Sequence, residues 1–308
     1  MLFEEKILEI EKLLNPAFDN LFQLVINNQI HAGDLLLVYE NGSYNSNLEN
    51  DVISNENSLP YSIGPTKDVF SECTHFKFIE AYRDNYMCKI TQVEYLSKIQ
   101  ETNIEKDELN SLVFREELSI QLEMLIYLKI WEADSFIRKF YQLARLANGI
   151  EYDSHFRIAV SDRDKEFTGT RQEIIRNKIR KMFKDKLPIL YNSFKNSYKT
   201  QIRNSIAHSN YSFVNRIICL NNYIKGVKGS ELKILKFENW VDIFHETMVL
   251  YNEYVKFFNK VNSYYSEIAK DKNNLIDIRL CFQNIENKIE IRQMEYRPDW
   301  DDFKLKFD

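Results

Sequence analysis

The chain is poor in the residues that interrupt or cross-link a fold. Among its 308 residues there are seven glycines, five prolines and four cysteines. The cysteines (Cys73, Cys88, Cys219 and Cys281) lie far apart without paired spacing, which argues against a disulfide framework or a zinc site. We therefore expect a reduced, cytoplasmic protein.

Long apolar runs are also missing. No stretch of eighteen apolar residues occurs, so no segment is predicted to span a membrane. The first residues, Met1 to Lys6, are charged and amphipathic, unlike a signal peptide. The sequence contains no internal repeat, P-loop, dinucleotide fingerprint or G-x-S-x-G motif, so it gives no sign of those nucleotide-binding and hydrolase classes. A content of 44% hydrophobic and 28% charged residues is usual for a globular protein.

What the chain does contain is the hexamer R-N-S-I-A-H, from Arg203 to His208. Histidine titrates near neutral pH and can move protons. Arginine is always cationic, and its planar fork matches a phosphate. Asn204 can hold a phosphate oxygen or a ribose hydroxyl. Together these groups can cleave a phosphodiester without a metal.

The hexamer closes a predicted amphipathic helix over 188–208. Pro188 suits its first turn, and Asn210 with the β-rich stretch beyond it marks the end. Apolar residues recur at every fourth position: Leu190, Phe194, Tyr198, Ile202 and Ile206. This stripe predicts a buried face. Arg203, Asn204 and His208 lie off the stripe, so we expect them to face solvent or a partner chain.

This motif at the end of an amphipathic helix, in an otherwise helical chain, resembles the R-x(4–6)-H signature of the HEPN superfamily. Asn215-Arg216 is similar to an N-R pair that follows the motif in abortive-infection members. The resemblance implies a helical bundle, usually dimeric, in which two motifs meet in one composite site. Many members are metal-independent endoribonucleases that act as toxins, abortive-infection proteins or CRISPR effectors. The chain departs from adenylylated toxins, which carry tyrosine two residues after the histidine, where Asn210 stands here.

The resemblance implies RNA as substrate, Arg203, Asn204 and His208 as catalytic residues, and no cofactor or metal. It also implies a homodimer, with a regulatory protein or antitoxin as a further partner and a role in anti-phage defence or as a toxin. In such proteins a long helix packs against the motif helix and sometimes contributes an acidic residue. Glu132 and Asp134 are the candidates on the helix expected over 111–148.

A basic segment precedes the motif. Residues 163–203 carry twelve lysines and arginines against four acids, although the net charge of the whole chain is −5. This charge indicates a polyanion-binding surface, and the alternative is a solvated helix face. The residues predicted to bind RNA are Arg171, Arg176, Arg180, Lys181, Lys184, Lys199, Tyr211 and Arg216. Tyr211 can stack on a base, or be an ordinary core aromatic.

We predict a mainly α fold: a HEPN-like helical bundle with a β-hairpin insert and a small extended C-terminal region. The proposed regions are 1–108, with a loop at 41–66, then 109–270 for the bundle, and 271–308. Short helices are expected within 67–108, with Thr91 as an N-cap, and further helices over 4–14, 17–29, 170–186 and 239–270, the last capped by Asn239. The helix over 111–148 is expected to end at Gly149, to kink near Trp131 and to bury one side, made of Leu118, Leu122, Leu125, Phe136, Ile137, Phe140 and Leu143. Residues 34–39 are either a strand or a helical turn. The insert is expected as strands 213–220 and 231–237, with a turn at Asn221-Asn222.

Two other interpretations of the motif stay open. In one, the chain is a non-catalytic helical module that binds RNA, a nucleotide or a protein partner through the same basic face, or serves as an interaction module of a larger defence complex, because fold does not fix function. In the other, Arg203 is a solvated side chain and His208 only favours the helix C-terminus.

Overall fold

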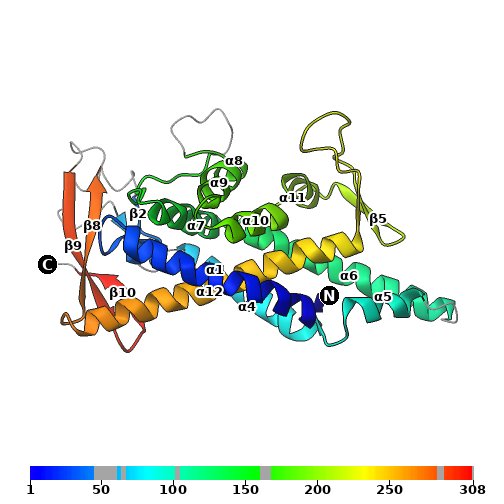
Figure 1. Ribbon diagram of the computed structural model, residues 1–308, viewed down its shortest axis with the longest axis horizontal. Helices are drawn as coiled ribbons and strands as arrows, with labels where there is room; N and C mark the ends of the chain where they lie inside the picture. The colour runs from blue at the N-terminus through cyan, green and yellow to red at the C-terminus, as the bar shows by residue number, and fades with distance from the viewer. Residues whose placement is uncertain (45–60, 64–66, 101–104, 160–167, 283–287, 307–308) are drawn as a thin grey trace. The chain divides into compact units, whose positions relative to one another are not determined.

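The computed structural model describes residues 1–44, 61–63, 67–100, 105–159, 168–282 and 288–306. These residues are mainly helical, with small sheets of two or three strands (Figure 1). The chain divides into two compact units, each assembled from three segments. Unit 1 comprises Met1–Pro16, Cys73–Ala133 and Ile189–Glu253, and unit 2 comprises Ala17–Glu72, Asp134–Pro188 and Tyr254–Asp308.

Unit 1 contains the motif. The elements that lie wholly within it are β1 (Leu2–Phe3), β4 (Met87–Cys88), α5 (Gln92–Gln100), α6 (Lys106–Trp131), α11 (Thr200–Ala207), β5 (Tyr211–Val214), β6 (Ile217–Leu220) and β7 (Ile234–Lys236). Four helices have residues in both units: α1 (Glu4–Asn28), α4 (Lys67–Tyr86), α10 (Pro188–Ser197) and α12 (Phe237–Lys270).

Aromatic side chains form the centre of unit 1. Trp131 at the end of α6 packs on Tyr198, with ring centroids 5.1 Å apart, and on Phe194 at 5.8 Å. Tyr127, one turn earlier, packs on Trp240 of α12 at 5.5 Å. All five rings are at most 3% exposed. Because large buried aromatic rings dominate core energetics, this cluster fixes α6, α10 and α12 as the frame on which α11 lies.

Unit 2 contains shorter helices and the C-terminal sheet. Its elements are α2 (Asp34–Tyr39), β2 (Ser43–Tyr44), β3 (Tyr61–Ser62), α7 (Asp134–Ala147), α8 (Arg171–Glu173), the π-helical η1 (Ile174–Arg180), α9 (Lys181–Phe183), β8 (Leu275–Phe282), β9 (Lys288–Arg297) and β10 (Asp302–Leu305). The last three strands form one antiparallel sheet in the order β10-β9-β8. The prediction of a small extended C-terminal region is confirmed.

Several local predictions are confirmed. The mainly helical class is correct, and 34–39 is helical rather than a strand. Thr91 caps α5: the Glu94 N–H donates to its Oγ1 at 3.1 Å, and Glu94 accepts from the Thr91 N–H at 2.7 Å. Gly149, at φ +70°, ends α7 as a left-handed cap, with the Ile150 N–H donating to the Arg145 oxygen.

The prediction of two N-terminal helices is wrong. α1 runs from Glu4 to Asn28 without a break, and Pro16 lies inside it. A proline in a helix interior costs a backbone hydrogen bond. On either side of it Leu14, Ala17 and Phe18 are at most 5% exposed, and this burial offsets the local loss.

The long helix expected over 111–148 is two helices. α6 ends at Trp131 and α7 begins at Asp134, so the bend expected near Trp131 is a break. The expected buried side is wrong in its first half, because Leu118 and Leu125 are 47% and 46% exposed. Ser119, Glu123 and Tyr127 are buried instead, since each polar group finds a hydrogen-bond partner there.

The insert also differs from its prediction. β5 and β6 form a hairpin whose turn is Asn215-Arg216, both at positive φ, and β7 pairs on the far side of β6. Two residues with positive φ fit the tight turns that suit hairpins. α12 begins at Phe237, so Asn239 lies inside the helix rather than capping it.

The predicted loop over 41–66 lies mostly outside the described residues, and only its ends can be placed. Ser43 pairs with Ser62 in a short antiparallel ladder between β2 and β3. Residues Arg163 and Lys165, at the start of the basic segment, also lie outside the described residues.

Candidate functional site

The motif occupies the last turn of α11. The helix spans Thr200–Ala207, and His208 follows as its C-terminal cap, with its N–H donating to the Asn204 oxygen at 3.1 Å. Ser209 has φ +51°, and the Asn210 N–H returns to the Ser205 oxygen at 2.7 Å. These bonds satisfy carbonyls that a helix end leaves open, so the position of His208 is fixed by the backbone.

The helix expected over 188–208 is broken at Tyr198 and Lys199. α10 ends at Ser197 and α11 starts at Thr200, with Lys199 in extended conformation. The five-residue apolar stripe is nevertheless buried throughout, at 7% exposure or less. The Tyr127 hydroxyl donates to the Ser197 oxygen and accepts from the Lys199 N–H, each at 3.0 Å. A buried side chain from α6 thus replaces the backbone bonds that the break removes.

We predict that Tyr127→Phe lowers the free energy of unfolding by about 1–3 kcal/mol, because the buried Ser197 carbonyl and the partly buried Lys199 N–H lose the hydroxyl as their partner. Urea unfolding measures this loss. The matched control is Tyr86→Phe, on the more exposed ring at the end of α4. If Tyr127→Phe unfolds at the same urea concentration as the control, the hydroxyl does not hold the break between α10 and α11.

Arg203 is paired with Glu132. Its Nε lies 2.9 Å from Glu132 Oε1, and the two side chains are 17% and 35% exposed. Glu132 is the C-terminal cap of α6, and α11 packs against α6. Arg203 was expected to face solvent or a partner chain; within this chain most of its side chain is covered. A guanidinium has five N–H donors, so one carboxylate does not use up its capacity to bind a phosphate.

Of the two acidic candidates, the structure brings only Glu132 to Arg203. Asp134 starts α7 in unit 2, where its Oδ1 accepts from Arg171 at 2.6 Å and 3.1 Å. Arg171, one of the residues predicted to bind RNA, thus forms an ion pair with Asp134 within unit 2.

His208 is exposed, and Asn204 is half-buried. Among the residues that the structure describes, none hydrogen-bonds the His208 ring. His245 of unit 1 is fully buried. Its Nε2 accepts from the Phe3 N–H at 2.7 Å, and its Nδ1 lies 2.7 Å from the Val241 oxygen. Burial lowers the pKa of His245 to about 3, which keeps it neutral at ordinary pH. Of these two histidines, only His208 is open to a substrate.

The remaining RNA-binding candidates of unit 1 have different surroundings. Lys199 reaches back to the Lys195 oxygen at 2.7 Å. Tyr211 is half-buried, packs on Phe213 with ring centroids 5.6 Å apart, and has its pKa raised by burial. Tyr211 therefore packs as an ordinary aromatic side chain of the β5-β6-β7 sheet.

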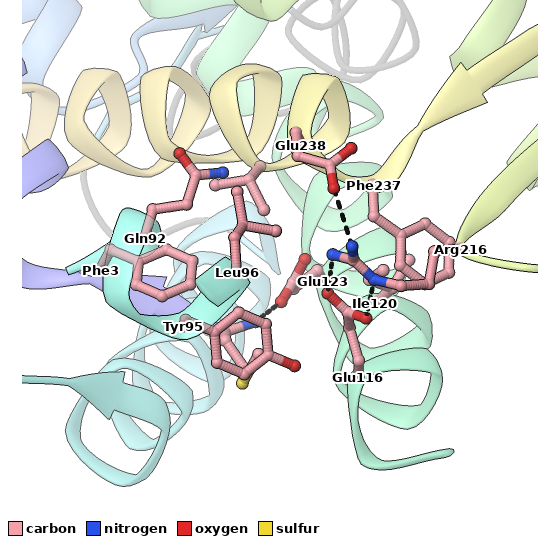
Figure 2. A pocket seen from close by; sticks show the side chains of 12 residues that line it. Phe3, Gln92, Tyr95, Leu96, Glu116, Ile120, Glu123, Arg216, Phe237 and Glu238 are labelled. Atoms are coloured by element: carbon pink, nitrogen blue, oxygen red, sulfur yellow. Dashed lines mark hydrogen bonds and ion pairs between the residues drawn. The ribbon is translucent and has the colours of Figure 1, made fainter. Parts of the chain in front are cut away.

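Arg216 is held by two carboxylates. It donates to both oxygens of Glu116 at 2.7 Å, and its Nη1 lies 3.0 Å from Glu238 Oε1 (Figure 2). The hydrogen bonds that Arg216 donates to Glu116 raise the pKa of its guanidinium above the usual value. Figure 2 shows these groups on one wall of a small pocket, opposite Tyr95 and Gln92. Because Glu116 and Glu238 already neutralise its charge, we do not assign Arg216 a phosphate contact.

In unit 2 the other candidates follow the helical run from α8 to α9. Thr170 caps its start, accepting from the Glu173 N–H at 3.4 Å. Arg176 and Arg180 are half-buried, and Lys181 and Lys184 are exposed. The basic candidates are therefore divided between the two units, with Lys199 and the motif in unit 1 and the other lysines in unit 2.

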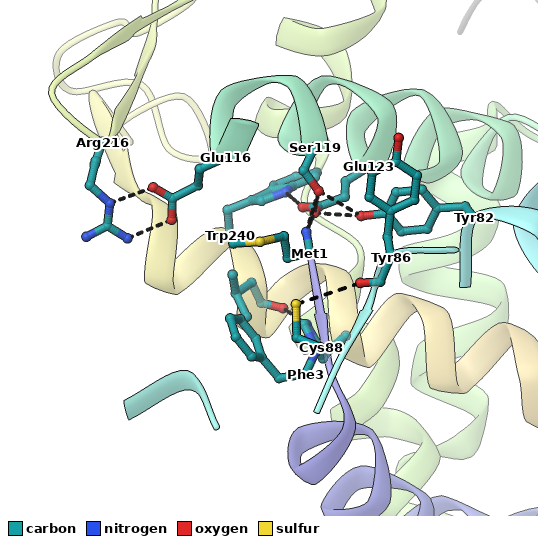
Figure 3. A network of polar contacts seen from close by, with 12 residues as sticks. Met1, Phe3, Tyr82, Tyr86, Cys88, Glu116, Ser119, Glu123, Arg216 and Trp240 are labelled. Atoms are coloured by element: carbon teal, nitrogen blue, oxygen red, sulfur yellow. Dashed lines mark hydrogen bonds and ion pairs between the residues drawn. The ribbon is translucent and has the colours of Figure 1, made fainter. Parts of the chain in front are cut away.

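Sequence reasoning missed a buried acid in unit 1. Glu123 is fully buried, and its Oε1 accepts from Tyr82 at 2.8 Å and Ser119 at 2.9 Å, while Oε2 accepts from the Trp240 indole at 2.7 Å (Figure 3). The Met1 nitrogen contacts the same carboxylate. The burial of Glu123 was not evident from the neighbouring sequence, because its donors Tyr82 and Trp240 come from α4 and α12.

Within the described ranges, no helix is both long and apolar enough to cross a membrane. The same residues include no group of three or more histidine, cysteine, aspartate or glutamate side chains able to hold a metal ion. Comparison with known proteins found no matching family model, no curated relative and no solved structure of significant similarity.

Proposed function

We propose that this chain is a metal-independent endoribonuclease of the HEPN type, active in anti-phage defence or as a toxin. The observation that carries the proposal is that two side chains with different chemical roles lie five residues apart at the end of one helix. Arg203 is partly buried and oriented by Glu132, while His208 stands exposed at the C-terminal cap of the same helix. An oriented cation beside an accessible proton carrier is the arrangement that phosphodiester cleavage needs.

In the proposed reaction the ribose 2′-hydroxyl attacks the adjacent phosphorus. His208 accepts the hydroxyl proton, and an imidazolium supplies a proton to the departing 5′-oxygen as the P–O bond breaks. Arg203 stabilises the added negative charge on the phosphorane oxygens. Asn204 orients the phosphate or the ribose. The products are a 2′,3′-cyclic phosphate and a 5′-hydroxyl, so no redox partner or external nucleophile is required.

The acid and the base are proposed to come from two copies of the chain. His208 and the following residues, Ser209 and Asn210, are exposed at the end of α11, where a second copy can approach. We expect light scattering to give twice the monomer mass. Asn210→Trp, which adds bulk beside His208, should shift the population towards monomer, whereas Asn239→Trp on α12 should not. A monomer at every concentration, or a dimer indifferent to Asn210→Trp, would remove the composite site.

One observation favours the alternative of a non-catalytic module that binds RNA or a partner protein. The ion pair with Glu132 offsets the charge of Arg203, which weakens any phosphate contact that the arginine makes. One assay distinguishes the nuclease from the binding module. Labelled RNA incubated with the protein and EDTA is cut to cyclic-phosphate ends by the nuclease, and is shifted but left intact by the binding module.

A further inference from the structure

The loop between β6 and β7, residues 221–233, contains two successive tripeptides of the form aliphatic-Lys-Gly, which the proposed chemistry does not use. Its sequence from Ile224 is I-K-G-V-K-G. The Val227 N–H donates to the Ile224 oxygen and the Ser230 N–H to the Val227 oxygen, so two β-turns follow one another. Gly226 and Gly229 have φ of +76° and +89°, the conformation needed at the third position of a type II turn. Lys225 and Lys228 therefore occupy the second position of each turn.

This loop, called the lysine loop below, projects away from the sheet (Figure 1). Every residue from Ile224 to Gly229 is exposed, including Ile224 at 54% and Val227 at 45%. A methyl group added at Gly226 or Gly229 would meet no atom within 4 Å. The loop is nevertheless ordered by its own bonds, since the Ile224 N–H also donates to the Ser230 oxygen at 2.8 Å.

The charge of the lysine loop is not compensated locally. No carboxylate of the described residues pairs with Lys225, Lys228 or Lys233, and Glu231 is the only acid within the loop. Arg203 and Arg216 differ in this respect, because each is paired with one or two glutamates. The lysine loop therefore offers free positive charge next to the motif helix, together with two exposed aliphatic side chains.

The lysine loop is tied to the motif helix through Gln201. The Gln201 side chain donates to the Leu232 oxygen at 2.7 Å and accepts from the Leu232 N–H at 3.0 Å. Its backbone oxygen accepts from Asn222 at 2.9 Å. Gln201 thus holds both ends of the loop, and it lies two positions before Arg203 on α11. The loop and the motif form one connected element of unit 1.

We propose that the lysine loop binds the phosphate backbone of single-stranded RNA and guides the strand to the motif, an inference that rests on the proposed nuclease function. Lys225 and Lys228, at equivalent positions of successive turns, contact successive phosphates. Ile224 and Val227 lie against the bases without reading their sequence. Lysines make such contacts as point charges, so the binding is independent of sequence and sensitive to salt.

The test measures binding of fluorescent poly(U) RNA to the uncleaving His208→Ala protein by anisotropy. Adding Lys225→Glu and Lys228→Glu should weaken binding by about tenfold or more and reduce the log–log salt slope by about 1.4, the value for two single-strand phosphate contacts. Lys225→Gln with Lys228→Gln should give a smaller loss. The control, Lys89→Glu with Lys98→Glu, makes the same charge change on exposed residues of unit 1 and should alter affinity less than about threefold.

Unchanged affinity and salt slope in the loop variant would overturn the proposal. The proposal would also be overturned if the parent protein bound phosphatidylserine vesicles more tightly than poly(U) and the loop variant lost this vesicle binding. The lysine loop would then bind a membrane surface rather than RNA. Cleavage is measured separately with the unaltered chain, which keeps both His208 and the loop lysines. If the unaltered chain cuts RNA but the loop substitutions leave RNA binding unchanged, only the loop proposal fails. If the unaltered chain neither binds nor cuts RNA, both proposals fail.

Discussion

His208→Ala and Arg203→Ala should each reduce RNA cleavage by a factor of about 10² to 10⁴. The first change removes the group that moves protons, and the second removes the cation that meets the charge of the phosphorane. Both are measured as initial rates on one labelled RNA in EDTA. We expect the loss in kcat rather than in KM, because these interactions form mainly in the transition state.

The fold should survive both substitutions. His208 is exposed, and surface changes usually alter stability by about 0.5 kcal/mol or less. Arg203→Ala leaves Glu132 without this ion pair, but Glu132 is 35% exposed and can be hydrated. Matched controls are Ser212→Ala beside the motif and Lys195→Ala on α10, both exposed. Variants that melt with the controls but cleave like the unaltered chain would exclude these residues from catalysis.

Glu123→Ala should lower the free energy of unfolding by about 3–5 kcal/mol. The carboxylate accepts from Tyr82, Ser119 and Trp240 (Figure 3). Truncation leaves the Trp240 indole without this acceptor, and it leaves the Tyr82 and Ser119 hydroxyls, 3.1 Å apart, with only one bond between them. Urea unfolding monitored by tryptophan fluorescence measures the change, since Trp240 is itself one of the donors.

Two comparisons show whether the network causes this loss. Glu123→Gln keeps the volume but can accept through only one atom, so it should lose less than the alanine variant. Glu108→Ala, on the exposed start of α6, should cost about 0.5 kcal/mol or less. A Glu123→Ala protein as stable as Glu108→Ala would mean that water replaces the lost acceptor and that the network does not stabilise unit 1.

Periodicity predicted the burial of the motif helix correctly. The stripe from Leu190 to Ile206 is buried throughout, because apolar residues at every fourth position lie on one side of a helix and that side packs against the core. The break at Tyr198 and Lys199 was not predictable in the same way. It depends on the hydroxyl of Tyr127, about seventy positions away in sequence, and no local pattern carries that information.

Hydropathy misplaced the buried face of α6 for a related reason. Leu118 and Leu125 were expected to be buried and Glu123 was not, because a hydropathy scale scores each side chain alone and takes no account of its hydrogen-bond partners. The motif residues themselves were recognisable from the sequence, but the pairing of Arg203 with Glu132 rather than Asp134 required the fold. The division into regions 1–108, 109–270 and 271–308 stays a prediction.

The most direct test of the proposed nuclease compares the unaltered chain with His208→Ala on the same RNA in EDTA, with the products identified by mass spectrometry. The account predicts 2′,3′-cyclic phosphate and 5′-hydroxyl ends from the unaltered chain and none above background from His208→Ala. Equal cleavage by the two proteins, or cleavage by the unaltered chain that EDTA eliminates, would contradict it.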